Sequence, residues 1–546
     1  MARRHAGRLS VVVLLATAAL GLASASASAS TGQEAWLQDD GALMYDPSGT
    51  MQQLRLLGVD RARVAVHWLF IAPRPNSHTR PRFDAANPAA YPAGSWRSLD
   101  RIVKAAEADG IAVNFNVVGG APLWATGPGA PGSKPHPSWE PSAKEFNLFV
   151  RAVGTRYSGN YDPHTHRTTP GDPGDLPAVT FWSIWNEPDY GPSLAPQGVP
   201  GNLTVEEAPR LYRGLLDAAW TALRQTGHGS DQILIGEIAP RGVDNFGLFS
   251  GIRALQFVRA LYCVDNRYRQ LRARAATLRG CPSTAAGSRA FRRAHPGLFN
   301  ASGFADHPYS RWHPPNVERP NHPDFTSMAD IGQLERSLDR VQRAYGSGKR
   351  FAIYNTEYGY LTSPPKHPTR TTPIISTTTA ALFLNQAEYM SWRDPRMKSF
   401  SQYLLADPVV PKLSNDYGGF ASGLLNYKHQ AKATYDAWRL PVYLPVTTTR
   451  RGGSLEVWGC ARPAFYAMQD DPIAPEIVQI QFRRDSGGGF TTLRSVTITS
   501  RVGYFDTRIS FPSSGTVRLI WTYPSDDSLL SPGTTAASRP VRVTVR

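Results

Sequence analysis

The distribution of apolar residues predicts a regular alternation of buried strands and amphipathic helices between residues 35 and 440. Each short apolar or β-branched run is followed by a segment with apolar residues at helical spacing. Strands are predicted at residues 35–38, 62–68, 111–118, 181–187, 233–237, 302–307, 351–357 and 400–405. Helices are predicted at residues 51–57, 99–108, 142–157, 204–224, 252–271, 331–341, 380–392 and 431–438.

Eight strand–helix units favour an α/β fold in which the strands close into a (β/α)8 TIM barrel. A doubly wound dinucleotide-binding sheet would carry G-x-G-x-x-G after its first strand, and that motif is missing there. Two helix starts have the pattern of a capping box, Ser142 with Glu145 and Thr204 with Glu207.

The pattern changes after residue 442, where apolar and polar residues alternate with a period of two. This alternation, interrupted by Gly, Ser, Pro and Asp clusters, is typical of antiparallel strands. We therefore expect a barrel at residues 31–441 and a small immunoglobulin-like or fibronectin-like β-sandwich at residues 442–546. Its strands are predicted at residues 454–458, 477–482, 495–499, 507–511, 517–521 and 541–545.

The first 30 residues have the composition of a secretory signal peptide. A basic start with Arg3 and Arg4 precedes an apolar segment at residues 11–22 and an Ala-Ser alternation at residues 23–30. The apolar segment is short for a membrane span, so we expect an extracellular protein without a membrane span after cleavage. An uncleaved anchor is the alternative interpretation.

The length of 546 residues suits one barrel and one smaller domain, and 41% hydrophobic residues suit a globular protein. The net charge of +16 is spread over scattered arginines, so the sequence does not indicate a nucleic-acid partner. Residues 263–300 form an arginine-rich insertion, which is either a solvated excursion or a rim that meets an acidic polymer. Its arginines include Arg272, Arg274, Arg279, Arg289, Arg292 and Arg293.

The chain has only three cysteines, which are too far apart for a metal-binding motif. In an exported protein, Cys263 and Cys281 are close enough in sequence to form a local disulfide that fastens the insertion. Cys460 would then be left over, either buried or free.

Among the predicted strands that end in a carboxylate, one ends at Glu187 in Asn-Glu-Pro and another at Glu357 in Asn-Thr-Glu. Reactive groups of a barrel lie at the carboxyl ends of its strands, so we expect both at one mouth. A glycosidase needs such a pair on opposite sides of the bond that it cleaves. Alternatively, Glu187 is a helix N-terminal acid or a turn residue. Glu237 also ends a strand, and we interpret it as a supporting polar residue.

Together, these residues resemble the clan of (β/α)8 retaining glycoside hydrolases of the cellulase-like family 5 and xylosidase-like family 39 type. In that clan, Asn-Glu-Pro ends strand four with the acid/base, and a Glu at the end of strand seven is the nucleophile. The resemblance implies that Glu187 is the acid/base, that Glu357 is the nucleophile, and that Asn186 holds the sugar 2-hydroxyl. The match covers the barrel and not the sandwich.

Other positions fit the same clan. The resemblance implies that Arg63 lies beneath the nucleophile and keeps it ionised, and that Tyr309 of the His307-Pro-Tyr motif donates to the nucleophile. The chain departs from the clan at strand eight, where Tyr403 replaces a common tryptophan. Sugar-binding or supporting roles also remain open for Trp68 and for Trp124 in the strand-three loop, although both are typical packing residues. His67 and His307 have a similar alternative, as satisfied histidines of the core.

The resulting hypothesis is hydrolysis of O-glycosidic, preferentially β-linked, bonds in an oligo- or polysaccharide with retention of configuration. Glu187 must stay protonated until the leaving group departs, and we expect Trp182 and Trp185 to provide an apolar surround. The mechanism needs no metal or organic cofactor. The alternative is a silent barrel that only binds carbohydrate or a cell surface; sugar specificity and oligomeric state stay open.

Overall fold

The computed structural model describes residue 30 and residues 32–132, 134–362, 374–409, 420–463, 476–522 and 534–546. The predicted signal peptide lies outside the described residues, apart from Ser30. Within those residues, no helix combines the length and apolar character needed to cross a bilayer.

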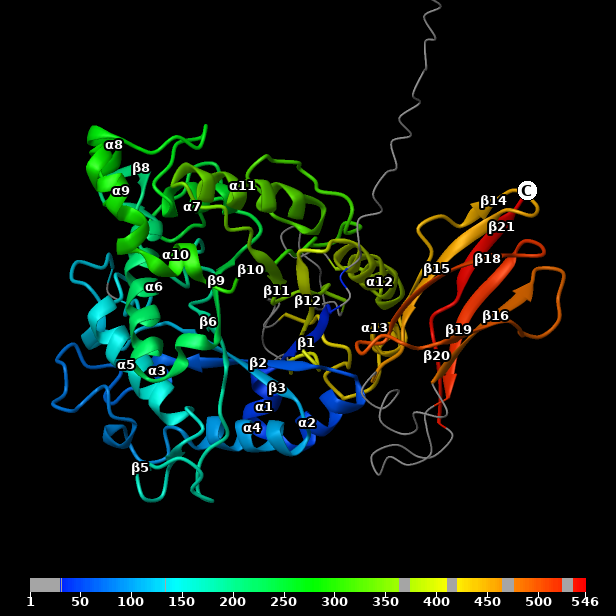
Figure 1. Cartoon of the computed structure of the whole chain (residues 1–546), viewed down its shortest axis with the longest axis horizontal. Helices are drawn as coiled ribbons and strands as arrows, with labels where there is room; N and C mark the ends of the chain where they lie inside the picture. The colour runs from blue at the N-terminus through cyan, green and yellow to red at the C-terminus, as the bar shows by residue number, and fades with distance from the viewer. Residues whose placement is uncertain are drawn as a thin grey trace, which may run out of the picture.

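Eight parallel strands close into a barrel in the order β1-β2-β3-β6-β9-β10-β11-β12, and β12 pairs with β1 (Figure 1). The predicted TIM-barrel fold is confirmed. The strands are β1 (Glu34–Gln38), β2 (Arg61–His67), β3 (Ala112–Val118), β6 (Phe181–Ile184), β9 (Gln232–Ile238), β10 (Gly303–Asp306), β11 (Ala352–Asn355) and β12 (Met397–Tyr403).

An aromatic layer fills the barrel interior near the start of several strands. Trp36 packs edge-on against Phe181 at 5.3 Å between ring centroids, and Tyr354, Leu234 and Ala305 complete the cluster. Because this end is filled by apolar groups, the interior polar side chains gather toward the carboxyl ends of the strands.

Amphipathic helices surround the barrel and bury one face each against it. In α11, Ile331, Leu334, Leu338 and Val341 are buried at the predicted helical spacing. The main helices are α1 (Asp40–Tyr45), α2 (Pro47–Leu56), α4 (Arg97–Ala108), α5 (Ala143–Arg156), α6 (Ala208–Gln225), α7 (Ala254–Leu261), α11 (Ile331–Ala344), α12 (Thr377–Arg393) and α13 (Ala433–Arg439). Shorter elements are α3 (Trp68–Ile71), η1 (Pro88–Ala90), η2 (Leu123–Ala125), β4 (Tyr161–Asp162), β5 (Arg167–Thr168), η3 (His228–Ser230) and η4 (Met328–Asp330).

One of the two predicted capping boxes is wrong. Ser142 caps α5, and its hydroxyl accepts the Glu145 N–H at 3.3 Å. Thr204 instead lies in strand β8 (Asn202–Glu206), which pairs with β7 (Gly198–Val199), and α6 begins only at Ala208. These residues therefore form a β-hairpin, although their local sequence pattern is that of a first helical turn.

The helix predicted at residues 252–271 is also wrong, because α7 ends at Leu261. The chain turns at Cys263, which has a φ of 56°, and a disulfide joins Cys263 to Cys281. The insertion continues as α8 (Ala273–Thr277), α9 (Ala285–Ala294) and α10 (Pro296–Asn300).

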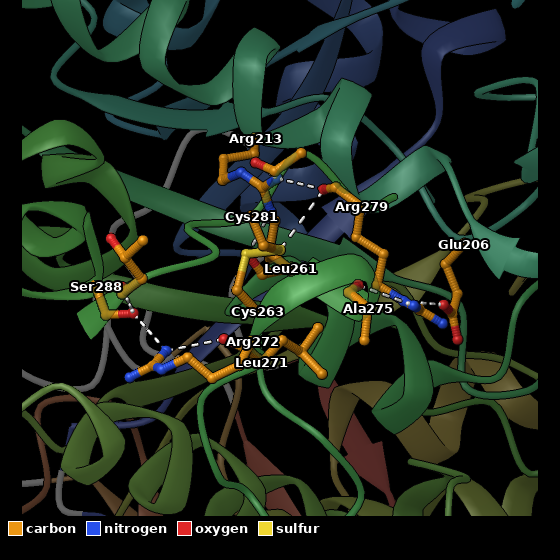
Figure 2. The surroundings of a disulfide bond; sticks show 12 residues. Glu206, Arg213, Leu261, Cys263, Leu271, Arg272, Ala275, Arg279, Cys281 and Ser288 are labelled. Carbon is orange, nitrogen blue, oxygen red and sulfur yellow. Dashed lines mark hydrogen bonds and ion pairs between the residues drawn. A yellow bond between two sulfur atoms is a disulfide. The ribbon is translucent and has the colours of Figure 1, made fainter. Parts of the chain in front are cut away.

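Arginines on both the barrel and the insertion join the two (Figure 2). Arg213 of α6 donates to the carbonyls of Leu261 at 2.9 Å and Arg279 at 3.0 Å. Arg279 in turn pairs with Glu206 at 2.7 Å. These contacts give part of the arginine-rich segment a structural role around the disulfide.

Two sheets follow the barrel, with α12 and α13 lying toward them (Figure 1). One has the order β13-β15-β18, and the other has the order β14-β21-β19-β16-β17 with β20 on β19. Their mostly antiparallel pairing fits the predicted β-sandwich, and Cys460 is buried and free. The strands are β13 (Val442–Tyr443), β14 (Thr448–Thr449), β15 (Ser454–Cys460), β16 (Ile477–Arg484), β17 (Thr491–Thr497), β18 (Tyr504–Ser510), β19 (Gly515–Thr522), β20 (Thr535–Ala537) and β21 (Val541–Val545).

Candidate active site

The two candidate acids lie just beyond the strands that were predicted to end in them. β6 ends at Ile184 and β11 at Asn355, so Glu187 and Glu357 belong to the loops that follow. Glu187 has a φ of 42° and stands in a tight turn, because the Tyr190 N–H donates to the Glu187 carbonyl at 2.9 Å. It is therefore not a helix N-terminal acid.

Left-handed backbone conformations gather at this mouth of the barrel. Trp185, Glu187 and Glu237 have φ values of 68°, 42° and 49°. Such conformations are unfavourable for residues with a side chain and concentrate where function requires a fixed geometry. The Glu187 N–H donates to the Glu237 carbonyl at 2.7 Å, which ties the two loops together.

Glu187 and Glu357 face each other across the mouth. One carboxylate oxygen from each and one ring nitrogen of His307 all lie within 4.8 Å of one another. The Glu187 side chain is 21% exposed and that of Glu357 10%, so neither is fully buried. The structure thus brings together the pair that the sequence singled out.

Arg63 of β2 is fully buried beneath this pair. Its guanidinium donates to Glu357 Oε1 at 2.7 Å, to Asn186 Oδ1 at 2.8 Å and to Glu237 Oε2 at 3.0 Å, and it also contacts Gln38. The contact between Arg63 and Glu357 is the one that the resemblance implied. A planar guanidinium can fix several acceptors at once, so this residue sets the positions of three loops.

His307 lies between three carboxylates. Its Nδ1 is 3.0 Å from Glu187 Oε1 and 3.6 Å from Glu357 Oε2, and its Nε2 is 2.9 Å from Glu237 Oε2. Burial lowers the pKa of His307, but these carboxylates outweigh burial and raise the pKa to about 10. His307 is therefore an imidazolium at neutral pH.

Glu237 contacts both cations of the site, Arg63 and His307, which fits its interpretation as a supporting polar residue. It is completely buried, and its Oε2 also accepts the Thr356 hydroxyl at 2.7 Å. Burial raises the pKa of Glu237, yet the charges of Arg63 and His307 prevail and lower the pKa to about 2. The sequence indicated a supporting role for Glu237 but not its contacts with Arg63 and His307, which are distant in sequence.

The pKa of Glu357 is raised by burial, and His307 and Arg63 oppose that rise. This direction differs from the one expected from the Arg63 pairing alone, because the burial of Glu357 cannot be measured from the sequence. Tyr309 donates its hydroxyl to Glu357 Oε2 at 3.1 Å and is stacked on Tyr358. Glu357 therefore has hydrogen-bond donors on both carboxylate oxygens.

A cavity of about 300 Å³ opens above the pair and includes the predicted residues Arg63, Asn186, Glu357 and Tyr403. Trp185 also lines it, as expected. The Gly119 backbone lies close to Trp185, since an added Cβ would come within 2.3 Å of the indole. Sequence reasoning missed several residues that line the cavity, which include Gln38, Asp40, Gly119, Gly120 and Ser193. His67 also lines the cavity, although the sequence left open the alternative that it is a core histidine.

Three tryptophans do not have the positions that a sugar-binding role would require. Trp68 starts α3 and packs in the layer outside the barrel, 6.3 Å from Trp124 between ring centroids. The Trp124 N–H donates to the Pro73 carbonyl. Trp182 packs against His228, with 4.7 Å between the ring centroids, and does not surround Glu187. All three pack in the core of the barrel domain, which agrees with the packing alternative stated for Trp68 and Trp124 and corrects the expected apolar surround for Trp182.

Three side chains at this site offer ligand atoms for a cation. Glu187, His307 and Glu357 are close enough together to share a cation. A histidine ligand must be deprotonated on the nitrogen that binds the metal. His307 has both ring nitrogens against carboxylates, so it would have to release a proton before it could bind an ion.

The chain is similar in structure to several solved proteins at low sequence identity. One is a family 39 glycoside hydrolase from Bacteroides cellulosilyticus WH2, with a TM-score of 0.44, 15% identity and coverage of 89% of this chain and 80% of that one. Another is a glucosidase from Croceicoccus marinus, with a TM-score of 0.42, 12% identity and coverage of 84% of this chain and 89% of that one. A third is an endo-β-1,4-mannanase from Thermotoga petrophila, with a TM-score of 0.39, 8% identity and coverage of 94% of this chain and 98% of that one. No protein-family model and no curated protein matches the chain.

Proposed function

We propose that the protein is a retaining glycoside hydrolase that acts through a covalent glycosyl-enzyme intermediate. The observation that carries the proposal is the approach of Glu187 and Glu357, because one carboxylate oxygen of each lies within 4.8 Å of the other at the mouth of the barrel. Retaining enzymes hold their two carboxyl groups about 5–5.5 Å apart, whereas inverting enzymes need about 6.5–9.5 Å to admit water. The spacing here favours retention.

The surroundings of the two acids favour different roles for them. Glu357 receives donors from Arg63 at 2.7 Å and from Tyr309 at 3.1 Å, which orient it and stabilise its anion as a nucleophile. Glu187 is the more exposed of the two and contacts only His307 among these groups, so its other oxygen is free to reach a leaving group.

The charge balance of the site agrees with a protonated acid. Arg63 and His307 supply two positive charges, while Glu237, Glu357 and Glu187 are three carboxyl groups. The cluster is neutral when one of these three carboxyls holds a proton, and the proposed mechanism uses that proton at Glu187, the more accessible of the two catalytic acids.

In the reaction, Glu357 attacks the anomeric carbon and forms a glycosyl ester, while Glu187 protonates the departing oxygen. Glu187 then removes a proton from water, which attacks the same carbon and releases Glu357. Asn186 is held by Arg63 at the cavity wall, where its amide can bind a sugar hydroxyl. Tyr403 lines the same wall and can pack against the sugar ring.

We also infer that the mature chain is exported. The disulfide between Cys263 and Cys281 supports this inference, because structural disulfides persist in oxidising compartments. Cleavage of the signal peptide after residue 30 would be tested by determining the N-terminal sequence of the secreted protein.

The test is hydrolysis of a panel of aryl β-glycosides by the wild type, Glu187→Gln and Glu357→Gln. We expect turnover by the wild type and a loss of about 10³-fold or more in each variant. Glu34→Gln is the matched control, because Glu34 is a carboxylate paired with Arg61 at the opposite end of β1 and β2. Glycan binding by the wild type without turnover of any glycoside would favour the silent binding protein instead.

A further inference from the structure

A second cavity, of about 580 Å³, lies on the outer flank of the barrel, apart from the catalytic mouth. It is bordered by α4, by the loop before it and by the turn between β4 and β5, elements that lie in the lower part of Figure 1. Its volume is within the range of about 300–1,000 Å³ that is usual for ligand sites. None of its lining residues belongs to the active site.

The α4 wall of this cavity is strongly positive. Arg97, Arg101 and Lys104 are exposed and recur at intervals of four and three residues, which places them on one helix face. From the helical rise, they span about 10 Å along the axis. Among the described residues, none of the three has an acidic partner.

The single carboxylate of the cavity does not neutralise this row. Asp100 is already bound by Arg156 through two contacts of 2.9 and 2.6 Å, and it also accepts the Tyr157 hydroxyl. The cavity therefore has three uncompensated positive charges. His164 and His166 from the opposite wall add ring nitrogens that can serve as further donors.

We propose that this flank cavity binds an acidic saccharide segment with repeating carboxylate or sulfate groups. A row of cations about 10 Å long suits successive anions along a chain better than one isolated anion. Pro92 and Pro163 also line the cavity and supply apolar surface, which suits the C–H faces of sugar rings.

Single-stranded nucleic acid fits this cavity less well, because its bases require exposed aromatic faces for stacking. The cavity is lined by Tyr91 and Trp96, and both are nearly buried. Tyr91 is 7% exposed and Trp96 is 5% exposed. The Trp96 ring is stacked on Phe149 and also contacts the Arg156 guanidinium, so neither of its faces is available.

The test is binding of fluorescent oligosaccharides to the purified protein, measured by anisotropy. The probes are a polyuronate, a sulfated oligosaccharide and a neutral oligosaccharide of equal length, so that the two acidic probes distinguish carboxylate from sulfate. The variant Arg97→Ala/Arg101→Ala/Lys104→Ala removes the row. The matched control Arg289→Ala/Arg292→Ala/Arg293→Ala removes the same charge from α9, where all three arginines are exposed.

We expect binding of at least one acidic probe and none of the neutral one. The α4 variant should bind about tenfold more weakly, while the α9 control should bind within about threefold of wild type. Equal losses in both variants, absence of binding to both acidic probes, or tighter binding of an oligonucleotide of the same charge would overturn the proposal. Both variants should retain aryl-glycoside hydrolysis, so this outcome is independent of the proposed function.

Discussion

The buried carboxylate of Glu237 offers the sharpest test of how the active site holds its charges. Glu237→Gln keeps the shape of the side chain and removes only its negative charge. The Glu237 Oε2 atom accepts hydrogen bonds from Arg63 at 3.0 Å, His307 at 2.9 Å and Thr356 at 2.7 Å. Two of these three donors are cations, so the substitution weakens two charge-assisted hydrogen bonds.

The expected loss follows from the difference between charged and neutral hydrogen bonds. A charge-assisted bond contributes about 1.5–3 kcal/mol and a neutral one about 0.5–1.5 kcal/mol. The two weakened bonds together should therefore reduce the free energy of unfolding by about 2–3 kcal/mol. The share that belongs to His307, about 1.4 kcal/mol, corresponds to about one pKa unit.

The sign of the pH effect is set by the raised pKa of His307. Its protonation stabilises the fold fully below the unfolded pKa of about 6.5. That stability is lost as the pH rises through the folded pKa of about 10. In Glu237→Gln the pKa of His307 falls by about one unit, so the decline starts near the unfolded pKa as in the wild type but ends about one pH unit earlier.

The assay is the thermal midpoint measured from pH 6 to pH 11, together with kcat/KM on an aryl glycoside. Glu388→Gln is the matched control, because Glu388 is an equally buried carboxylate paired with Arg462 outside the site. Both variants should be destabilised at pH 7. Only Glu237→Gln should shift the alkaline decline and lower kcat/KM, by about tenfold for 1.4 kcal/mol. An unshifted decline with wild-type activity would refute the charge network described for His307.

Three further predictions test separate parts of the structure. Tyr309→Phe removes the hydroxyl that donates to Glu357 and should lower kcat/KM about tenfold; an unchanged value would show that this bond does not act in the transition state. Gly119→Ala should raise KM because the new Cβ meets the Trp185 indole, and an unaltered KM would contradict this packing. Cys281→Ala opens the 18-residue disulfide loop and should lower the free energy of unfolding by about 3 kcal/mol, measured by denaturant titration; equal stability would contradict a structural role.

The barrel was predictable because each β/α unit has a strong local pattern. Buried strands such as Ile233 to Glu237 are short apolar runs, and α11 repeats its apolar residues at helical spacing. Tertiary context overrode the local signal where the predictions were wrong. Thr204 has the spacing of a helix cap, but strand pairing between β7 and β8 takes those residues first.

The candidate acids were predictable for a similar reason, since Glu187 and Glu357 terminate recognisable strand patterns. The function of Glu237 was not, because it depends on contacts with Arg63 and His307, which are distant in sequence. The tryptophans illustrate the same limit. Composition shows that Trp68 and Trp124 are present, but only packing shows that they stabilise the outer layer.

The most direct test of the central claim is to trap the glycosyl-enzyme. An activated aryl 2-deoxy-2-fluoro-β-glycoside, taken from the sugar that the protein hydrolyses best, slows the second step so that the ester accumulates. Intact-mass and peptide analysis should find one fluoroglycosyl group on the peptide that contains Glu357, and none in Glu357→Gln. Turnover without any adduct, or an adduct on another carboxylate, would contradict the assignment of Glu357 as nucleophile.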